Sequence, residues 1–389
     1  MSSPLAKRMN LLAPYLFADL DRKKEAAKAR GVDVIALTIG DPDIPTPPPI
    51  VAAGERALRD PETHRYPAYA GSPIFRQAAA EWFGRRYQVT LDPDQEVLAL
   101  IGTKEGIGHL MVALVDPGDV VLCPDPGYPV YSIATHLAGG EPYGMPLTAE
   151  HGFMPDLDAI PKKVAERTKA LWINYPNNPT TAVADRAFLE KAVAFAHAHG
   201  CILCVDSAYS EITFDGYRAL SVLELSDARP VTIEFHSLSK TYSMCGWRVG
   251  FAVGAREIVG ALGTLKNNLD SGVFQAVQLA GVEALRSWPT YLPELLATYQ
   301  HRRDVLVTGL RAAGYEPFLP RATFYVWMPV PGGDDVSFAG RLIEQVGVMV
   351  TPGSGFGPSG KGYVRFSLTV DEGRLQEAVM RIKKAGLSG

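Results

Sequence analysis

Long hydrophobic runs are missing from this sequence. No uninterrupted apolar stretch approaches the roughly 20 residues that a membrane span needs. The apolar segment 9–18 follows Lys7 and Arg8, as in a signal peptide, but Asn10 and Pro14 interrupt it and a charged, helix-like stretch replaces the cleavage site. We therefore expect a cytoplasmic protein with no membrane partner.

Excess positive charge and cysteine are also scarce. The 38 lysines and arginines are outnumbered by 42 acidic residues, and the net charge is −4, which disfavours nucleic acid and anionic surfaces as partners. Only four cysteines are present. Cys201 and Cys204 form a C-x-x-C, but an extended "CILCVD" would point them to opposite faces, so buried free thiols are favoured over a redox pair or a metal site.

The composition is that of an ordinary globular protein, and the pattern of apolar segments differs between the main part of the chain and its last hundred residues. Its 389 residues are 47% apolar and 21% charged, enough for a large core and two domains. Short apolar segments alternate with helix-like ones such as 185–200, which ends at Gly200. This alternation predicts a mainly parallel sheet covered on both faces. The expected strands lie at 120–123, 170–174, 201–206, 231–236 and 249–254.

The last hundred residues follow a different pattern. A long helix is expected near 292–314, then the strand-like segments "TFYVWMPV", "GVMVTPG" and "YVRFSLT", and a closing helix at about 371–385. This indicates a second, smaller α+β unit. We expect residues 1–45 to form an N-terminal arm and part of this unit, 46–284 the large domain, and 285–389 the small C-terminal domain.

Polar residues follow the expected strands, at the sheet edge where ligands of such folds bind. Tyr128 comes after the first strand, Asn178 after the second, Asp206 at the end of the third, and "SLSK" with Lys240 after the fourth. Upstream, a turn at Gly102 opens a helix whose first amides can hold an anion. Five loops that converge on one edge predict a binding site.

The residue types match four chemical demands of one molecule. A desolvated lysine such as Lys240 forms imines with carbonyls, and a buried Asp206 needs a cation such as a protonated pyridine nitrogen. Arg248 and the helix start at Thr103–Lys104 suit a phosphate, and the ring of Tyr128 can stack on a flat heterocycle. Aldehyde, pyridine, phosphate and ring face together describe pyridoxal 5′-phosphate.

At these residues the sequence resembles the class I aminotransferases, which are fold type I pyridoxal-phosphate enzymes. The resemblance implies an α/β fold, with a mainly parallel seven-stranded sheet between helices and a smaller α+β domain. It covers almost the whole chain. It is carried by "IGDPDIPTP" (39–47), "YPAYAG" (66–71), "NYPNNPT" (174–180), "DSAYSE" (206–211), "SLSKTYSMCGWRVGF" (237–251) and "YVRFSL" (363–368).

The resemblance also implies roles for individual residues. Lys240 would bond to the cofactor aldehyde as an imine and then carry the proton between the substrate α-carbon and the cofactor. Asp206 would pair with the ring nitrogen, and Tyr209 and Asn178 with the phenolate oxygen. The phosphate would be held by Thr103, Lys104, Ser237, Ser239 and Arg248.

Substrate binding and assembly follow from the same resemblance. Arg365 would grip the substrate α-carboxylate, with help from Asn178 and the backbone of Gly40. Tyr66 would reach the phosphate of a neighbouring subunit, which implies a homodimer with shared active sites. The implied reaction moves an amino group from an amino acid to a 2-oxo acid by a ping-pong mechanism.

Other interpretations of the motifs find less support in the sequence. "GFGPSGKG" (355–362) nearly matches a nucleotide-binding loop, but Gly362 replaces the required hydroxyl and a strand follows in place of a helix; we interpret it as a flexible loop that closes over the substrate. Ser237 and Lys240 fit S-x-x-K, but "SDN" and "KTG" are absent. A regulator with this fold would need an added DNA-binding domain, while a β-elimination lyase could use the same residues.

Within the family the sequence is most similar to the LL-diaminopimelate aminotransferase group, through "LIGTKEGIGHL", "DPGYPVY", "INYPNNPT" and "NNLDSGVFQA". That group moves the amino group of LL-diaminopimelate to 2-oxoglutarate. Two positions depart from the group: Ala70 replaces a Glu that could pair with a distal ammonium, and Thr181 replaces a Gly. These departures leave alanine, glutamate, methionine and aromatic amino acids open as donors.

Overall fold

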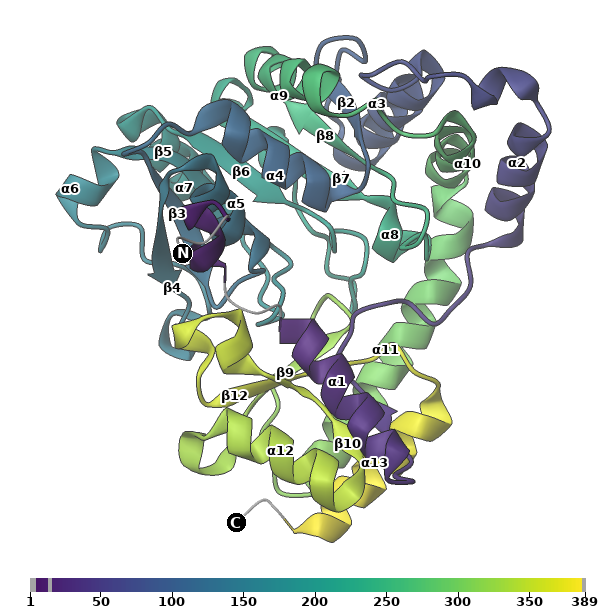
Figure 1. Cartoon of the computed structure of the whole chain (residues 1–389), viewed down its shortest axis with the longest axis vertical. Helices are drawn as coiled ribbons and strands as arrows, with labels where there is room; N and C mark the ends of the chain where they lie inside the picture. Colours follow the sequence, from purple (N-terminus) through teal and green to yellow (C-terminus); the bar gives the residue numbers. More distant parts are fainter. Residues whose placement is uncertain (1–4, 13–15, 387–389) are drawn as a thin grey trace.

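The structure is a computed structural model that describes residues 5–12 and 16–386. A seven-stranded sheet and its covering helices form the upper body in Figure 1, and a smaller group of strands and helices lies below it. Among the described residues, no helix combines the length and the apolar character that a membrane crossing requires.

The large sheet is parallel apart from one strand. β8 runs antiparallel to both of its neighbours, β2 and β7, and every other pair in the sheet is parallel. The order across the sheet is β2 (Val97–Leu100), β8 (Gly250–Gly254), β7 (Thr232–Ser237), β6 (Ile202–Asp206), β5 (Thr168–Ile173), β3 (Val120–Asp125) and β4 (Glu141–Pro146).

Both faces of this sheet are apolar and covered. In β5, Ala170 and Trp172 face one hydrophobic cluster while Leu171 and Ile173 face another, as strand periodicity requires. α4 (Thr103–Leu114), α5 (Val130–Ala138) and α9 (Arg256–Leu269) cover the first face. The other face is covered by α3 (Pro73–Tyr87), α7 (Arg186–His199) and α10 (Gln275–Arg286).

The expected strands of the large sheet are confirmed to within about two residues, and so is the helix at 185–200. Asp185 caps that helix through the Phe188 amide, and Gly200 ends it in a left-handed conformation (φ +63°). β4 was not expected from the sequence. It lies at the sheet edge, where the Pro and Gly of "EPYGMP" are tolerated.

The smaller unit contains a three-stranded antiparallel sheet and a two-stranded parallel one. The first has the order β11 (Thr351–Pro352), β12 (Tyr363–Ser367) and β9 (Tyr325–Pro329). The second pairs β1 (Ile35–Ala36) with β10 (Val348–Met349), so the N-terminal segment is part of this unit. Its helices are α1 (Leu16–Ala29), α12 (Asp335–Val346) and α13 (Glu372–Ala385).

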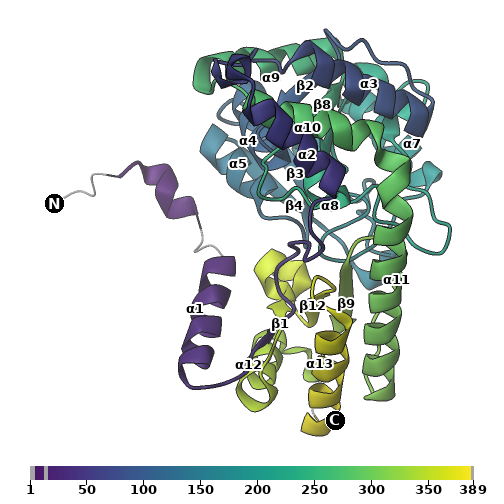
Figure 2. The ribbon, with the colours of Figure 1, turned by 90° about the vertical axis from the view of Figure 1, so that its right-hand side faces the viewer.

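The long helix α11 (Trp288–Ala312) connects the two units, as Figure 2 shows. Its first residue, Trp288, donates a hydrogen bond to Glu211 of the large unit (2.7 Å). Its C-terminal half places Leu306 and Leu310 in the small core. The segment 212–214 also joins that core and exchanges backbone hydrogen bonds with 321–323.

α1 stands to one side of the other helices of the smaller unit in Figure 2. The remaining elements are η1 (Lys7–Leu11), α2 (Pro48–Leu58), η2 (Pro61–His64), η3 (Ala149–His151), α6 (Lys162–Ala165), η4 (Val222–Glu224), η5 (Arg229–Val231), α8 (Leu238–Thr241), η6 (Pro331–Gly333), η7 (Gly353–Phe356) and η8 (Pro358–Gly360).

Candidate active site

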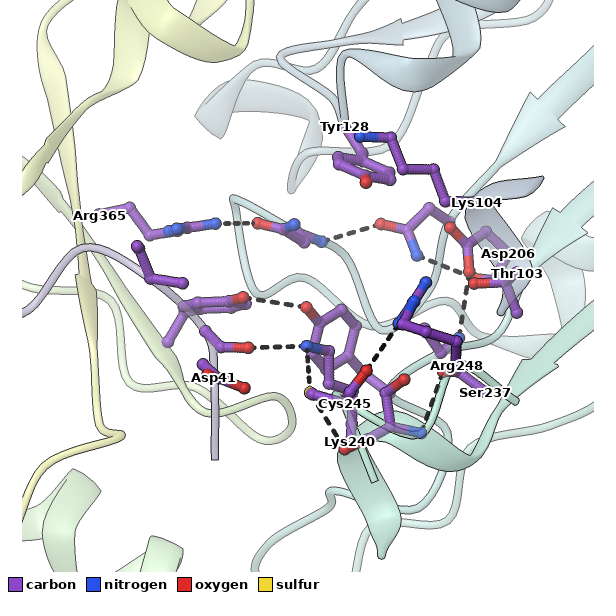
Figure 3. Close-up of a pocket in the computed structure, with 18 residues that line it drawn as sticks. Asp41, Thr103, Lys104, Tyr128, Asp206, Ser237, Lys240, Cys245, Arg248 and Arg365 are labelled. Carbon is purple, nitrogen blue, oxygen red and sulfur yellow. Dashed lines mark hydrogen bonds between the residues drawn. The ribbon is translucent and has the colours of Figure 1, made fainter. Parts of the chain in front are cut away.

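A cavity of about 430 Å³ lies where the carboxyl ends of β6 and β7 face the small sheet (Figure 3). This is the edge at which open α/β sheets bind ligands. Every predicted site residue except Tyr66 lines it. The predicted residues that the structure brings together are Gly40, Thr103, Lys104, Tyr128, Asn178, Asp206, Tyr209, Ser237, Ser239, Lys240, Arg248 and Arg365.

Asp206 ends β6 and is 4% exposed. The Tyr131 hydroxyl donates to its Oδ2 (2.8 Å), and the Ala208 amide donates to its Oδ1 (3.2 Å). Burial raises the pKa of the Asp206 carboxyl, and these hydrogen bonds oppose that rise. A cationic ligand would stabilise the carboxylate form at this position.

Lys240 lies in the one-turn helix α8, directly after β7. Its Nζ donates to the carbonyl of Gly40 (2.7 Å) and to Sγ of Cys245 (3.3 Å). Ser237 caps α8 by accepting from the Ser239 amide (3.2 Å), which fixes the turn that points Lys240 into the cavity. The lysine is therefore held in the cavity by groups from two distant segments.

One end of the cavity is cationic. Gly102 precedes α4 with φ +74°, and a Cβ there would lie 2.3 Å from Nη2 of Arg248. The guanidinium of Arg248 therefore fits directly against the start of α4, next to Thr103. Burial and the neighbouring Arg248 charge lower the pKa of Lys104. Two cations beside a helix N-terminus form a site suited to a multiply charged anion.

Arg365, at the other end, is 1% exposed and comes from β12 of the small sheet. Its guanidinium donates to Oδ1 of Asn178 and to the carbonyl of Thr38, both at 2.5 Å, and lies 4.0 Å from the ring centroid of Tyr325. Burial lowers its pKa. A guanidinium fixed this firmly can recognise a carboxylate with defined geometry.

The sequence of the chain matches the family described as "Aminotransferase class I and II" over residues 32–382. It is 53% identical to the LL-diaminopimelate aminotransferase of Syntrophobacter fumaroxidans over 380 residues, which cover 97% of this chain and 98% of that protein. It is 54% identical to the LL-diaminopimelate aminotransferase of Desulforudis audaxviator over 384 residues, 98% of each. The substrate-bound structure of BacF from Bacillus subtilis superposes with a TM-score of 0.95, at 38% identity and 98% coverage of both chains.

The chain belongs to the class I and II aminotransferases. Its fold is the predicted fold type I architecture, and it is a pyridoxal-phosphate-dependent transaminase. The predicted similarity to the LL-diaminopimelate aminotransferase group is confirmed by these relatives.

Several residues in or next to the cavity of this aminotransferase were not expected from its sequence. Tyr131 reaches Asp206 from α5, and Tyr325 places its hydroxyl 2.9 Å from that of Tyr209. Asn174 accepts from the Asn178 amide and donates to the Asp206 carbonyl (2.9 and 2.8 Å). Each lies in or beside a sequence segment named above. The sequence alone, however, does not distinguish these residues from ordinary core residues, and only their contacts in the structure do. The other unexpected lining residues are Ile39, Asp41, Ala208 and Cys245.

Three further positions of the aminotransferase lie apart from the cavity lining. Tyr66 is 86% exposed in the loop after η2. Ala70 packs against the hydrophobic cluster beneath α4, and its carbonyl accepts a hydrogen bond from the Ala99 amide (3.0 Å). Thr181 has φ +66°, a left-handed conformation that glycine adopts without strain, which gives a physical reason for the Gly expected there.

Proposed function

We propose that this aminotransferase transfers the amino group of LL-diaminopimelate to 2-oxoglutarate, using pyridoxal 5′-phosphate bound in the cavity. The observation that carries the cofactor assignment is the convergence of Lys240, Asp206 and Arg248 on one cavity, each from a different strand end. The donor assignment is supported by the two relatives described above, each more than 50% identical to this chain, which bear that substrate in their names and match over nearly their full length.

The residues present fit the phosphate of this cofactor. The phosphate would lie between Arg248, Lys104, the first amides of α4 and the hydroxyls of Ser237 and Thr103. A dianion there would offset the charge repulsion that, together with burial, lowers the pKa of Lys104. The absence of a side chain at Gly102 leaves the room that Arg248 needs.

The residues also fit the cofactor ring. Asp206 would pair with the protonated ring nitrogen, while Tyr131 and the Ala208 amide keep the carboxylate in place. Burial, and secondarily Tyr325, raise the pKa of Tyr209 well above its ordinary value, so that its hydroxyl stays protonated and can donate to the phenolate oxygen. Tyr128 would stack on the ring face.

Bound in this way, the cofactor supplies an aldehyde that reacts with amines and a ring that accepts electrons from the substrate α-carbon. Lys240 would bond to that aldehyde and, once displaced by the substrate amine, act as the base that removes the α-proton. Arg365 and Asn178 would hold the α-carboxylate, which fixes the direction of the C–H bond towards Lys240. The Gly40 backbone would complete that carboxylate site.

We also propose a homodimer with shared active sites. Tyr66 is exposed in the loop after η2, and further exposed apolar side chains occur in that loop and on or beside α2, α3 and α9. A second copy would bring its own Tyr66 to the phosphate end of this cavity. The other exposed apolar side chains in these segments are Leu58, Tyr69, Ile74, Leu269 and Phe274.

The proposed setting and domain limits follow the sequence expectations. We place the enzyme in the cytoplasm, in keeping with its four free cysteines. We propose 1–45, 46–284 and 285–389 as arm, large domain and small domain. These limits are supported by the hydrophobic core of the smaller unit, which contains Ile35 and Leu37 as well as residues from Leu295 onward.

The donor is tested by titrating the purified holoenzyme with single amino acids while recording its visible spectrum. We expect LL-diaminopimelate to convert the imine band to the pyridoxamine form at lower concentration than glutamate, alanine, methionine or phenylalanine. Preferential conversion by another donor would refute the LL-diaminopimelate assignment. An imine band that no donor converts would instead favour lyase chemistry.

The central residue is tested by Lys240→Ala. Because this change removes the imine-forming amine and the base together, turnover should fall to background, while binding of pyridoxamine phosphate should persist through the phosphate and ring contacts. Near-normal turnover by this variant would refute the role of Lys240.

The shared site is tested by mixing two inactive variants. Lys240→Ala and Tyr66→Ala enzymes are mixed, dissociated and reassociated, because a mixed dimer would carry both defects in one site and neither in the other. Activity should return to about a quarter of wild type if both parents are inactive and pairing is random. No recovery in a demonstrated mixed dimer would show that Tyr66 acts within its own chain.

A further inference from the structure

Cys245 differs from the other three cysteines in its exposure and in its contacts. Cys123, Cys201 and Cys204 are buried, whereas Cys245 is only partly buried and lines the cavity. Cys123 and Cys204 contact carbonyls of their own strands. Cys245 instead contacts the lysine on which the proposed reaction depends.

The chain makes this contact by turning back on itself. Lys240 lies in α8, and the turn that follows returns Cys245 beside the same helix. The Cys245 Sγ lies 3.3 Å from the Lys240 Nζ and 3.3 Å from the carbonyl oxygen of Ser239. The Ser239 carbonyl and the Asp41 carboxylate can only accept, so the thiol donates its one hydrogen to one of these two groups and a sulfur lone pair remains to accept from the amine.

The carbonyl of Gly40 approaches the same amine from the small-unit side at 2.7 Å. The Lys240 nitrogen therefore has one strong acceptor and one weak acceptor, on two different segments. A carbonyl and a thiol, both neutral, orient an amine without forming an ion pair with it.

The charges around Cys245 favour this neutral state. Burial raises the pKa of the Cys245 thiol, the Lys240 charge opposes that rise, and hydrogen bonding with Asp41 adds to it. The net direction is upward, so the sulfur remains a thiol. A thiolate would bind the ammonium form of Lys240 too tightly for a nitrogen that must release protons.

The proposed reaction requires the Lys240 nitrogen in two places. It would be bonded to the cofactor before the substrate arrives, and it would then have to lie free beside the α-carbon to accept a proton. A lysine released into an open cavity could adopt many rotamers, and a misplacement of about 1 Å can cost a hundredfold in rate. Groups that hold the free amine therefore matter in the second state.

We propose that Cys245 is a positioning residue which, together with the Gly40 carbonyl, holds the amine of Lys240 whenever that amine is not bonded to the cofactor. This role rests on the proposed function of Lys240, but the contact itself can be tested without measuring turnover. Cys245 touches neither substrate nor cofactor in the proposed role and acts through Lys240.

The contact is tested by the rate at which iodoacetamide alkylates Cys245 in the pyridoxamine phosphate form of the holoenzyme. In that form Lys240 is free, and its charge should favour the reactive thiolate. Lys240→Met keeps the side-chain length without the charge, so alkylation should slow by about threefold or more. Asp41→Asn should accelerate it, because Asp41 opposes ionisation.

Mass spectrometry of the peptide that carries Cys245 gives these rates, and the buried cysteines serve as internal references. Equal rates in wild type and Lys240→Met would overturn the contact. Retained turnover in Lys240→Ala would instead overturn the proposed function, so the two failures are distinguishable.

The consequence for catalysis is tested by Cys245→Ala in the holoenzyme. We expect kcat to fall about tenfold, the KM of the amino donor to change less than about twofold, and the isotope effect of an α-deuterated donor to rise because proton transfer becomes slower. Cys245→Ser keeps an acceptor and should stay within about threefold of wild type.

Cys201→Ala is the matched control, since it removes a thiol that lies in the core outside the cavity. It should leave kcat and the isotope effect unchanged. An unchanged kcat and isotope effect in Cys245→Ala would show that Cys245 only fills space and would overturn the proposal.

Discussion

At the scale of single residues, Gly102 matters because it has no side chain. It sits at the junction of β2 and α4 with a positive φ, and the guanidinium of Arg248 occupies the space that a Cβ would take. Arg248 itself has φ +54°. The cationic end of the cavity therefore depends on two unusual backbone conformations that bring a charge against a helix start.

We predict that Gly102→Ala weakens cofactor binding by about tenfold or more, because Arg248 must move away from α4. Equilibrium binding of pyridoxamine phosphate to the variant would measure this. Gly118→Ala is the matched control: Gly118 also has a positive φ (+99°), but nothing lies within 4 Å of its Cβ position. It should lose about 1 kcal/mol of stability through backbone strain and keep its cofactor affinity.

Residues at this scale were predictable when their chemistry was distinctive. Lys240 and Asp206 could be predicted to lie in one cavity because few buried positions suit an ammonium or a carboxylate, whereas Arg365 was named only through the family resemblance. Tyr131 and Tyr325 could not, because tyrosines are common in cores and only the three-dimensional contacts reveal which hydroxyl faces Asp206 or Tyr209. No role was predicted for Cys245, since its contact with Lys240 depends on the path of the turn after α8.

At the scale of elements, a buried ammonium joins α9 to α4. Lys266 has no exposed side-chain surface, and its Nζ lies 2.9 Å from Glu105 and 3.0 Å from Asp270. His109 lies 2.6 Å from Glu105. Burial opposes ionisation of Asp270, but hydrogen bonds from Lys266 and the Gly272 amide hold its pKa below the ordinary value. The ammonium occupies the centre of a group of side chains that could otherwise attract a metal ion.

We predict that Lys266→Met destabilises the protein by about 3–5 kcal/mol, because two carboxylates lose their buried counter-charge. Urea denaturation followed by circular dichroism would give the free energy of unfolding. Lys162→Met serves as the control, since Lys162 is 88% exposed and 3.8 Å from Glu166; it should change stability by less than about 0.5 kcal/mol. A similar small change in Lys266→Met would mean that the ion pairs contribute little.

A second link joins the segment before β1 to α13. Arg374 and Arg381 both donate to Asp33, and these hydrogen bonds, that of Arg374 first, lower the pKa of Asp33 to about 2. A carboxyl whose pKa is lower in the folded state contributes stability above its unfolded pKa near 3.9 and loses it as the pH falls towards 2.

We therefore predict that Asp33→Asn loses less stability than wild type between pH 4 and pH 2. Urea midpoints at pH 7, 4 and 3 would show this. Arg374→Gln should weaken the pH dependence in the same direction, because it removes the larger cause of the shift. Identical acid profiles for wild type and Asp33→Asn would show that the shift does not affect folding.

Elements were predictable where local signals agreed. The helix at 185–200 has a capping aspartate, apolar periodicity and a terminal glycine, so its bounds were correct to one residue at each end. The sequence of β4 is not enriched in the β-branched and aromatic residues typical of strands. Its extended structure is set by its pairing with β3. α8 was not expected as a helix, because one turn is too short to show a period.

At the scale of the whole molecule, the segment 353–360 of the small unit contacts the loop after β3. Asp125 accepts from the amide and hydroxyl of Ser359 (3.1 and 2.9 Å), and the Gly127 amide donates to the Phe356 carbonyl (2.9 Å). The Phe356 ring centroid lies 4.6 Å from the Arg365 guanidinium. This contact therefore links Arg365 to the large sheet.

We predict that Asp125→Ala raises the KM of the amino donor about fivefold with a smaller change in kcat, because Phe356 is held less firmly against Arg365. Steady-state kinetics of Asp125→Ala, Ser359→Ala and the double variant would test the link. If the two residues act together, Ser359→Ala should have little effect in the Asp125→Ala background. Additive effects would show that they act independently.

The two-unit architecture was predictable from the change in pattern after about residue 285, but the contacts between the units were not. Alternating strands and helices predict which edge of the sheet binds a ligand. They do not show that 212–214 pairs with 321–323, since that pairing joins segments more than a hundred residues apart and leaves no local pattern. The assembly of the cavity from both units had to be seen in the structure.

The hydrogen bond between Arg365 and the Thr38 carbonyl joins residues 327 positions apart. Ribosomes add about 5–20 residues per second, so roughly 16–65 s pass between the synthesis of Thr38 and that of Arg365. Late in that interval the nascent chain already contains Asp206 and Lys240 but still lacks Arg365. A chain released at that point would lack the guanidinium that we propose binds the substrate carboxylate, even if its large sheet had formed.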